Sequence, residues 1–151
     1  MTEPRKIFTV GTGTRTAEEF VALLHHYGVE QAVDVRSYPV SRFPHFRREE
    51  LEPFLEASGI HYLWMGPLLG GYRKGGYESY TKSEGFLRGL ALLEETAEER
   101  PTAIFCAETV PWKCHRRYIG FVLAERGWEV VHIISETNVW RPRSETQLEL
   151  G

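Results

Sequence analysis

The stretch "TAEEFVALLHHYGVEQAVDV", residues 16–35, decides the fold class of this chain. Apolar side chains recur every three or four positions from Phe20 to Tyr27, which is the spacing of an amphipathic helix. Thr16, with a glutamate three residues later, fits a capping box at the start of that helix. Gly28 then fits a left-handed helix end, and an apolar run typical of a buried strand follows. The stretch therefore predicts a helix followed by a strand.

The same order of helix, glycine and strand recurs along the chain. It is repeated in "REELEPFLEASGIHYLWM" (48–65) and "CHRRYIGFVLAERGWEVVHII" (114–134), while "KIFTV" (6–10) reads as an opening strand and a helix at 81–100 precedes the strand "TAIFC" (102–106). Strands that are nearly continuous apolar runs are typical of a parallel sheet with helices on both faces. We therefore predict a single three-layer α/β domain over residues 1–151, with a mostly parallel sheet of about five strands.

The composition fits one globular domain and gives the chain no strong overall charge. Hydrophobic residues make up 42% of the 151 residues, and the formal net charge of −3 provides no long-range attraction for nucleic acid or an anionic membrane. The N-terminus "MTEPRKIFTVG" lacks the apolar run of a signal peptide, and no stretch approaches the ~20 apolar residues of a membrane span. We expect a cytoplasmic protein without a membrane partner, whose two cysteines are reduced thiols rather than a structural disulfide.

Polar and basic residues follow the predicted strands, where parallel sheets bind ligands. "GTGTR" (11–15) runs from the first strand into a helix start, so Thr12 and Gly13 are candidates for contact with an anion, although a tight strand-to-helix turn explains the same residues. Asp34 lies inside an apolar run, and its carboxylate needs a buried partner such as Arg36, a helix start or the 12–14 turn.

A mixture of basic and aromatic side chains surrounds the second strand end and continues in the glycine-rich segment "MGPLLGGYRKGGYESY" (65–80), which we expect to be a long loop. Arginine suits bidentate contact with phosphate or carboxylate, and aromatic rings suit stacking. The alternative is a solvated loop whose aromatic rings plug the edge of the domain. The candidate substrate-binding residues, with the turn described above, are Arg36, Arg42, His45, Thr12, Gly13, Arg73 and Arg116.

The stretch "FCAETVPWKCHRRYI" (105–119) holds both cysteines of the chain. Cys114 lies near a helix start beside His115 and two arginines, and this positive surrounding lowers a thiol pKa. Cys106 ends a strand, where it is either a second functional thiol or a small buried hydrophobe. Glu108 or His115 could move a proton. The candidate catalytic residues are therefore Cys114, Cys106, His115 and Glu108, with Cys114 slightly favoured.

A metal site is the competing interpretation of the cysteines. Cys106, Cys114 and His115 could supply three ligands, with His45 or His132 as a fourth. Structural zinc sites, however, use closely spaced cysteine pairs, and these are absent from the sequence. We therefore predict no metal and no cofactor. His132 alternates into an apolar strand and is expected to be a hydrogen-bonded core residue.

Three segments of the chain resemble one known family. They are "FTVGTGTRTAEEF", "AVDVRSYPVSRFPHF" and "FCAETVPWKCHRRYIGFVLAERGWEVVHI". In order from about Ile7 to Ile134 they look like the bacterial and archaeal family called domain of unknown function 488. One departure is "GTGTR", where that family is expected to have a turn containing His, Ser and Asn. The resemblance implies an α/β domain without an established biochemical role.

A looser resemblance is to the rhodanese sulfurtransferase plan, which has a strand ending "DVR" and a later strand ending in a cysteine that is the nucleophile. Here seven residues separate Cys106 from Cys114, and the nearest following arginine is Arg116. That spacing is too long for a compact C-x₅-R anion cradle.

Two hypotheses for the function follow. The first is a thiol-dependent enzyme that acts on a small anionic substrate, including a nucleophile and resolving pair if the two Cα atoms lie within ~7 Å. The alternative is a non-catalytic binding module for a small anion, a nucleotide or single-stranded nucleic acid. The acidic net charge disfavours extended nucleic acid, and the oligomeric state is left open.

Overall fold

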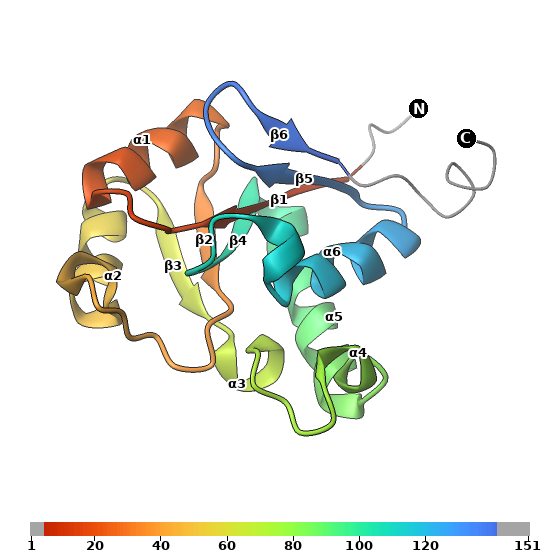
Figure 1. Ribbon diagram of the computed structural model, residues 1–151. Helices are drawn as coiled ribbons and strands as arrows, with labels where there is room; N and C mark the ends of the chain where they lie inside the picture. The colour runs from red at the N-terminus through yellow and green to blue at the C-terminus, as the bar shows by residue number, and fades with distance from the viewer. Residues whose placement is uncertain (1–4, 142–151) are drawn as a thin grey trace.

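A computed structural model describes residues 5–141 and shows one six-stranded sheet with the order β3-β2-β4-β1-β5-β6 (Figure 1). The strands are β1 (Lys6–Gly11), β2 (Gln31–Asp34), β3 (His61–Trp64), β4 (Thr102–Cys106), β5 (Glu129–Ile133) and β6 (Val139–Trp140). The first five are parallel to their neighbours, and β6 alone runs antiparallel, to β5. The mostly parallel sheet predicted from the sequence is confirmed.

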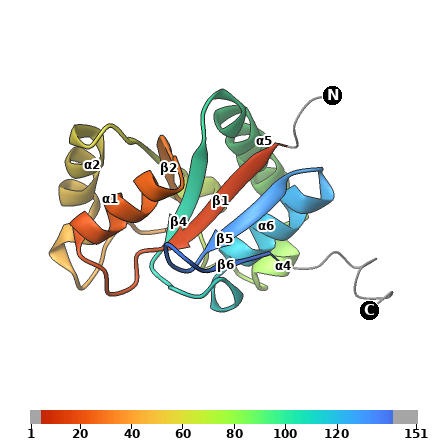
Figure 2. The same ribbon diagram turned by 90° about the horizontal axis from the view of Figure 1, so that it is seen from above.

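Helices cover both faces of the sheet, as predicted (Figure 2). α1 and α2 pack on one face, and α3, α5 and α6 pack on the other. The helices are α1 (Ala17–His26), α2 (Arg48–Ala57), α3 (Gly66–Leu69), α4 (Tyr77–Tyr80), α5 (Glu84–Glu99) and α6 (Arg116–Glu125), with 3₁₀ turns η1 (Pro44–Phe46) and η2 (Pro111–Lys113).

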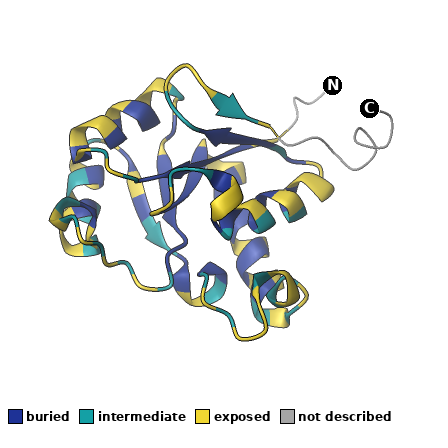
Figure 3. Cartoon of the chain, viewed as in Figure 1, coloured by how far each residue is buried: buried dark blue, intermediate teal, exposed yellow. Residues whose placement is uncertain are grey.

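Side chains point alternately to the two faces of the sheet, so the core consists of two layers, one on each face. Figure 3 shows the buried strands in dark blue between the half-buried helices. In β1, Phe8 and Val10 pack with α1 and α2, while Ile7 packs with α5 and α6. Both cysteines belong to the second layer. The alternation thus places both cysteines on the α6 side of the sheet.

The local signals at the helix ends are confirmed. The Thr16 hydroxyl accepts a hydrogen bond from the backbone N–H of Glu19, whose carboxylate accepts one from the N–H of Thr16. Gly28, Gly59 and Gly127 have φ values of 72°, 82° and 95°, a backbone conformation that glycine adopts without the steric cost of a Cβ.

Two features differ from the sequence prediction. Segment 65–80 is not only a loop, because it contains the one-turn helices α3 and α4. Arg73 stabilises α3 by donating to the carbonyls of Gly66, Pro67 and Gly70. The second difference is β6, a two-residue strand that folds back on β5. Within residues 5–141, no helix is both long and apolar enough to cross a membrane.

Candidate functional site

The predicted site segments meet at the carboxyl edge of the sheet. The loop after β1 is joined to the loop after β4, because the backbone N–H groups of Thr12 and Gly13 donate to the carbonyls of Cys106 and Ala107, at 2.8 and 2.9 Å. The loop after β2 is joined to the start of α6, because His115 Nε2 lies 2.8 Å from the carbonyl of Val35. One edge therefore carries the three segments that the sequence singled out.

Cys106 and Cys114 are joined in a disulfide at this edge, in place of the two reduced thiols that the sequence led us to expect. Both are nearly inaccessible, with 3% of Cys106 and 8% of Cys114 exposed. Their Cα atoms are 7.6 Å apart, slightly beyond the ~7 Å limit set above and beyond the usual span of a disulfide.

Arg116 is completely buried and touches one sulfur of the pair. Its Nη1 donates to Cys106 Sγ at 3.0 Å and to the carbonyl of Glu108, and its Nη2 donates to the carbonyl of Thr109. Nε donates to the hydroxyl of Thr9 at 3.1 Å. Burial lowers the pKa of Arg116 to about 10, so the group is still a cation at neutral pH. A positive charge is thus fixed beside Cys106.

His115 lies beside Cys114, with its ring nitrogen Nδ1 next to the sulfur. Because the carbonyl of Val35 can only accept, Nε2 carries the hydrogen, and the neutral ring turns the lone pair of Nδ1 toward Cys114 Sγ, 3.6 Å away. Burial lowers the pKa of His115, which keeps the ring neutral. Cys114 Sγ also accepts the backbone N–H of Arg116 at 3.5 Å, which places this sulfur at the start of α6 as predicted.

The glycines of "GTGTR" are explained by the close passage of the loop after β4. A Cβ on Gly11 would lie 1.8 Å from the carbonyl oxygen of Glu108, and one on Gly13 would lie 2.3 Å from the hydroxyl of Thr109. The amides of Thr12 and Gly13 already donate to carbonyls, so an anion would have to displace this loop to reach them. Anion binding at these two residues stays a prediction.

Arg36 lies on the other face of the sheet, in a buried cluster with Asp34. It forms a bidentate pair with that carboxylate, at 2.8 Å from both Nε and Nη2, and donates through Nη1 to the carbonyl of Phe46. Tyr62 donates its hydroxyl to the same carboxylate, and burial, with the negative charge of Asp34 second, raises the tyrosine pKa. Asp34 therefore has the partner predicted for it, and the Arg36 guanidinium is largely occupied.

The other predicted site residues lie around the same edge without joining the cysteines. Arg42 is exposed and stacks on Phe43, with its guanidinium carbon 4.8 Å from the ring centre. His45 Nε2 is bonded to the carbonyl of Arg15 at 2.9 Å. Glu108 is exposed, and Arg73 is engaged with α3. Substrate contact by Arg42, His45 and Arg73 stays a prediction, as does proton transfer by Glu108.

Thr9 is a site residue that the sequence reasoning missed. Its hydroxyl bonds both Arg116 Nε and the Nδ1 of His132, which confirms His132 as a hydrogen-bonded core residue. A single polar residue inside the apolar strand "KIFTVG" was the available signal. Within residues 5–141, no group of three or more His, Cys, Asp or Glu side chains is placed to hold a metal ion.

The fold and the site define an α/β domain with a paired-cysteine centre at the carboxyl edge of its parallel sheet. The model of the family described as domain of unknown function DUF488 matches residues 16–123, well over half of the chain. The chain belongs to this family, as its motifs predicted. The matched range contains both cysteines and Arg116 but ends before His132. No curated protein and no solved structure matches the chain.

Proposed function

We propose that the protein is a thiol enzyme whose Cys106 and Cys114 cycle between dithiol and disulfide while exchanging with a small anionic disulfide substrate. The observation that carries this proposal is the buried Arg116 cation, which donates to Cys106 Sγ at 3.0 Å. A cation next to a cysteine favours the thiolate, which is both the attacking form and the better leaving group. An ordinary structural disulfide has no need of such a charge.

The surroundings of the two sulfurs suit different roles. Cys114 is the more exposed, and His115 Nδ1 can take its proton, so its thiolate attacks one sulfur of the substrate and expels the other as a thiolate. Cys106, held as a thiolate by Arg116, then attacks Cys114 Sγ in this mixed disulfide. The second half of the substrate leaves as a thiolate, and both electrons come from the dithiol. A thiol reductant restores the pair by the reverse sequence, with Cys106 as leaving group.

The test uses Ellman's reagent, an anionic aromatic disulfide that releases a coloured thiolate. The reduced wild-type protein is expected to release two thiolates and to end with the internal disulfide. Cys106→Ser is expected to release one and to retain the reagent on Cys114. Cys114→Ser is expected to react at least about tenfold more slowly, because its remaining sulfur is the less exposed one. The chain contains no other cysteine, so each product can be assigned by mass.

The proposal fails if the wild-type protein retains two reagent molecules without forming the internal bond, or if Cys114 in Cys106→Ser does not react below the ~8.5 pKa of a free thiol. In the first case the two thiols would react independently of each other, and in the second Cys114 would be an ordinary core atom.

A second candidate function is supported by an exposed pair of aromatic rings. Tyr38 and Tyr72 are 69% and 91% exposed and lie with ring centres 6.4 Å apart, although they come from different loops. Tyr72 has a φ of 48°, unusual for a residue other than glycine and more frequent at functional sites. Successive bases of a single-stranded nucleic acid stack on exposed aromatic rings. If the protein binds single-stranded nucleic acid, we expect the two tyrosines to be the binding surface.

This second candidate is tested with a labelled thymidine oligonucleotide, by fluorescence anisotropy at increasing salt. Binding that weakens with salt and is lost in Tyr38→Ala/Tyr72→Ala, but not in Leu92→Ala, which truncates an exposed apolar residue on α5, is expected. Absence of binding at low salt, or binding unchanged in the double variant, removes the candidate.

A further inference from the structure

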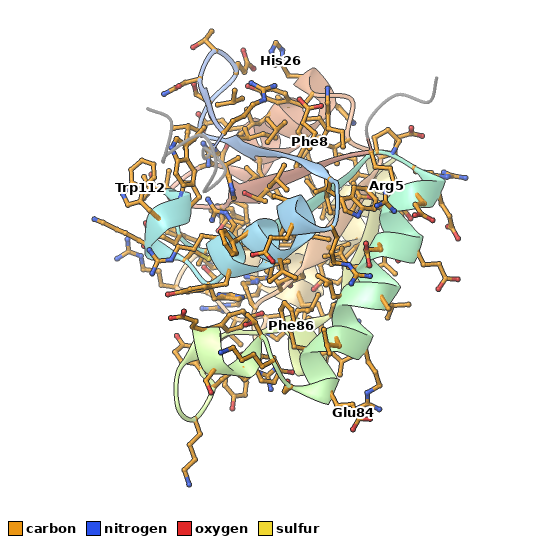
Figure 4. The ribbon with its side chains drawn as sticks, turned by 90° about the vertical axis from the view of Figure 1, so that its right-hand side faces the viewer. Arg5, Phe8, His26, Glu84, Phe86 and Trp112 are labelled. Carbon is orange, nitrogen blue, oxygen red and sulfur yellow. A yellow bond between two sulfur atoms is a disulfide. The ribbon has the colours of Figure 1, made fainter. Side chains whose placement is uncertain are left out.

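A groove on the outer side of α6 is separate from the cysteine pair. Figure 4 looks onto α6, with α4 below it and the β5–β6 hairpin above it. The groove encloses about 580 Å³, within the range of about 300–1,000 Å³ typical of small-molecule sites. Its walls are formed mainly by Tyr118, Phe121, Val122 and Trp140. These side chains give the groove flat and apolar walls.

His132 forms the floor of this groove, although only 1% of the residue is exposed. The Trp140 ring packs on one side of the imidazole, with ring centres 5.1 Å apart. Gly120 also packs against the ring, because a Cβ at this position would lie only 3.2 and 3.3 Å from the ring atoms Cε1 and Nε2. A residue with a side chain would press on this edge of the imidazole, so glycine suits the position.

The hydrogen-bond chain below the groove fixes the tautomer of His132. Arg116 has only donors, so its Nε gives a hydrogen bond to the Thr9 hydroxyl. Within residues 5–141 the only acceptor found near the hydrogen of this hydroxyl is Nδ1 of His132, so we assign the Thr9 hydroxyl as the donor to Nδ1. Burial, with the Arg116 charge second, lowers the pKa of His132 to about 3 and keeps the ring neutral. Nε2 consequently carries the hydrogen and is a donor.

No described residue accepts a hydrogen bond from this donor. Across residues 5–141 no hydrogen-bond partner is found for Nε2 of His132. The residue is part of the lining of the groove, so a ligand in the groove could supply the missing acceptor. A buried donor without a partner is costly unless a ligand or water accepts its hydrogen.

We propose that the groove binds a flat, neutral aromatic heterocycle whose acceptor nitrogen receives the hydrogen bond from Nε2 of His132. The aromatic walls fit the faces of such a ring, and the one buried donor fixes its orientation. The charged side chains at the groove are Glu78, Lys82, Arg117 and Glu125, two of each sign, which favours a ligand without net charge. The site does not involve the sulfurs, so it stands whether or not the thiol chemistry occurs.

The probes are quinoline, which has a ring-nitrogen acceptor, and indole, a similar bicycle that has a donor and no acceptor. Binding is followed at pH 8 by the ¹⁵N resonance of His132 Nε2. Quinoline is expected to shift this resonance and to bind about threefold to tenfold more tightly than indole, the effect of one hydrogen bond. His132→Phe, which keeps a ring but removes the donor, is expected to abolish the difference between the probes.

Phe121→Ala is the second variant, because Phe121 is a 45% exposed wall residue whose truncation leaves the buried network intact. It is expected to weaken both probes, whereas Leu92→Ala, which truncates an equally exposed apolar residue on α5, is expected to weaken neither. An unshifted His132 resonance at saturating quinoline, equal affinity for quinoline and indole, or unchanged binding in Phe121→Ala overturns the proposal. These outcomes remain decisive even if His132→Phe does not fold.

Discussion

Arg116 is a buried arginine that forms no ion pair with a carboxylate of residues 5–141, although the charge of Glu108 acts on it from a greater distance. Arg36, equally buried in practice, is paired with Asp34. An isolated cation in an apolar layer is unfavourable unless hydrogen bonds and a nearby negative group compensate for its lost hydration. The hydroxyl and two carbonyls around Arg116 supply part of this compensation. A thiolate at Cys106, formed when the pair is reduced, would supply the rest.

Arg116→Met is therefore expected to raise the pKa of the reduced Cys106 thiol, so that its alkylation by iodoacetamide begins at higher pH. It is also expected to lower the free energy of unfolding by about 2 kcal/mol, because buried acceptors lose their donors. Mass spectrometry of each alkylated cysteine against pH, with urea unfolding, gives both quantities. Arg117→Met, which changes an exposed neighbour, is the matched control. An unchanged pH profile for Cys106 in Arg116→Met would contradict the role of the charge.

The contacts of single residues were predictable from the sequence only where the partners are close in the chain. The pairing of Asp34 with Arg36, two residues away, followed from the need of a buried carboxylate for a partner. The contact of Arg116 with Cys106 did not follow from the sequence. The two lie ten positions apart, which is too far for a compact C-x₅-R cradle, so their spacing indicated no contact. The guanidinium reaches the sulfur from α6, which packs beside the end of β4, and no local pattern reports that packing.

At the scale of elements, the loop of residues 107–113 holds the site together. It crosses the glycine turn after β1, it is held by Arg116 from below, and it carries Cys106 and Cys114 at its two ends. Its position depends on the missing side chain at Gly11, where a Cβ would lie 1.8 Å from a loop carbonyl. The reactivity of the cysteines should therefore depend on this turn.

Gly11→Ala is expected to displace the loop, to lower the free energy of unfolding by about 1–3 kcal/mol through overpacking, and to slow formation of the Cys106–Cys114 disulfide. Urea unfolding and the rate of disulfide closure in a glutathione buffer measure these effects. Gly28→Ala is the control, because Gly28 needs a positive φ but a Cβ at this position would have no neighbouring atom within 4 Å. It is expected to lose about 1 kcal/mol of stability from backbone strain while closing the disulfide at the normal rate. Equal closure rates in the two variants would refute the steric role of Gly11.

The longer elements were predictable because each carries a repeated signal. α1, α2 and α6 have helical spacing followed by a glycine, and each strand after them is an apolar run. α3, α4 and β6 span four, four and two residues, which is too short for any period to show. The bend of the chain that joins the two cysteines is likewise a property of the loop between elements.

At the scale of the whole molecule, the strand order explains why four residues distant in sequence form one chain of contacts. β4, β1 and β5 are neighbours in the sheet, and they carry Cys106, Thr9 and His132 respectively. Arg116 spans the first two from α6. Crossover connections determine which strands become neighbours, and local periodicity contains no information on that choice. The cysteine pair could thus be proposed from the sequence, but its connection to His132 could not.

This chain of contacts makes the stability of the whole domain depend on pH through His132. The pKa of His132 is lowered from 6.5 to about 3, first by burial and then by the Arg116 charge. Between these values the unfolded chain binds a proton that the folded chain does not, so the free energy of unfolding falls as the pH drops below about 6.5. Above about pH 6.5 the imidazole is neutral in both the folded and the unfolded chain, so His132 then causes no loss of unfolding free energy.

His132→Gln removes this titration but keeps a side chain that can bond the Thr9 hydroxyl. Between pH 7 and pH 4 the wild-type protein is expected to lose on the order of 3 kcal/mol more unfolding free energy than His132→Gln, because each pKa unit of the shift corresponds to about 1.4 kcal/mol. Urea unfolding at several pH values measures the difference, in which the acidic groups common to both proteins cancel. His25→Gln, on the exposed side of α1, should keep the wild-type dependence. Parallel pH curves for wild type and His132→Gln would show that the imidazole takes up its proton without unfolding, and the neutral donor inferred for the groove would then hold only near neutral pH.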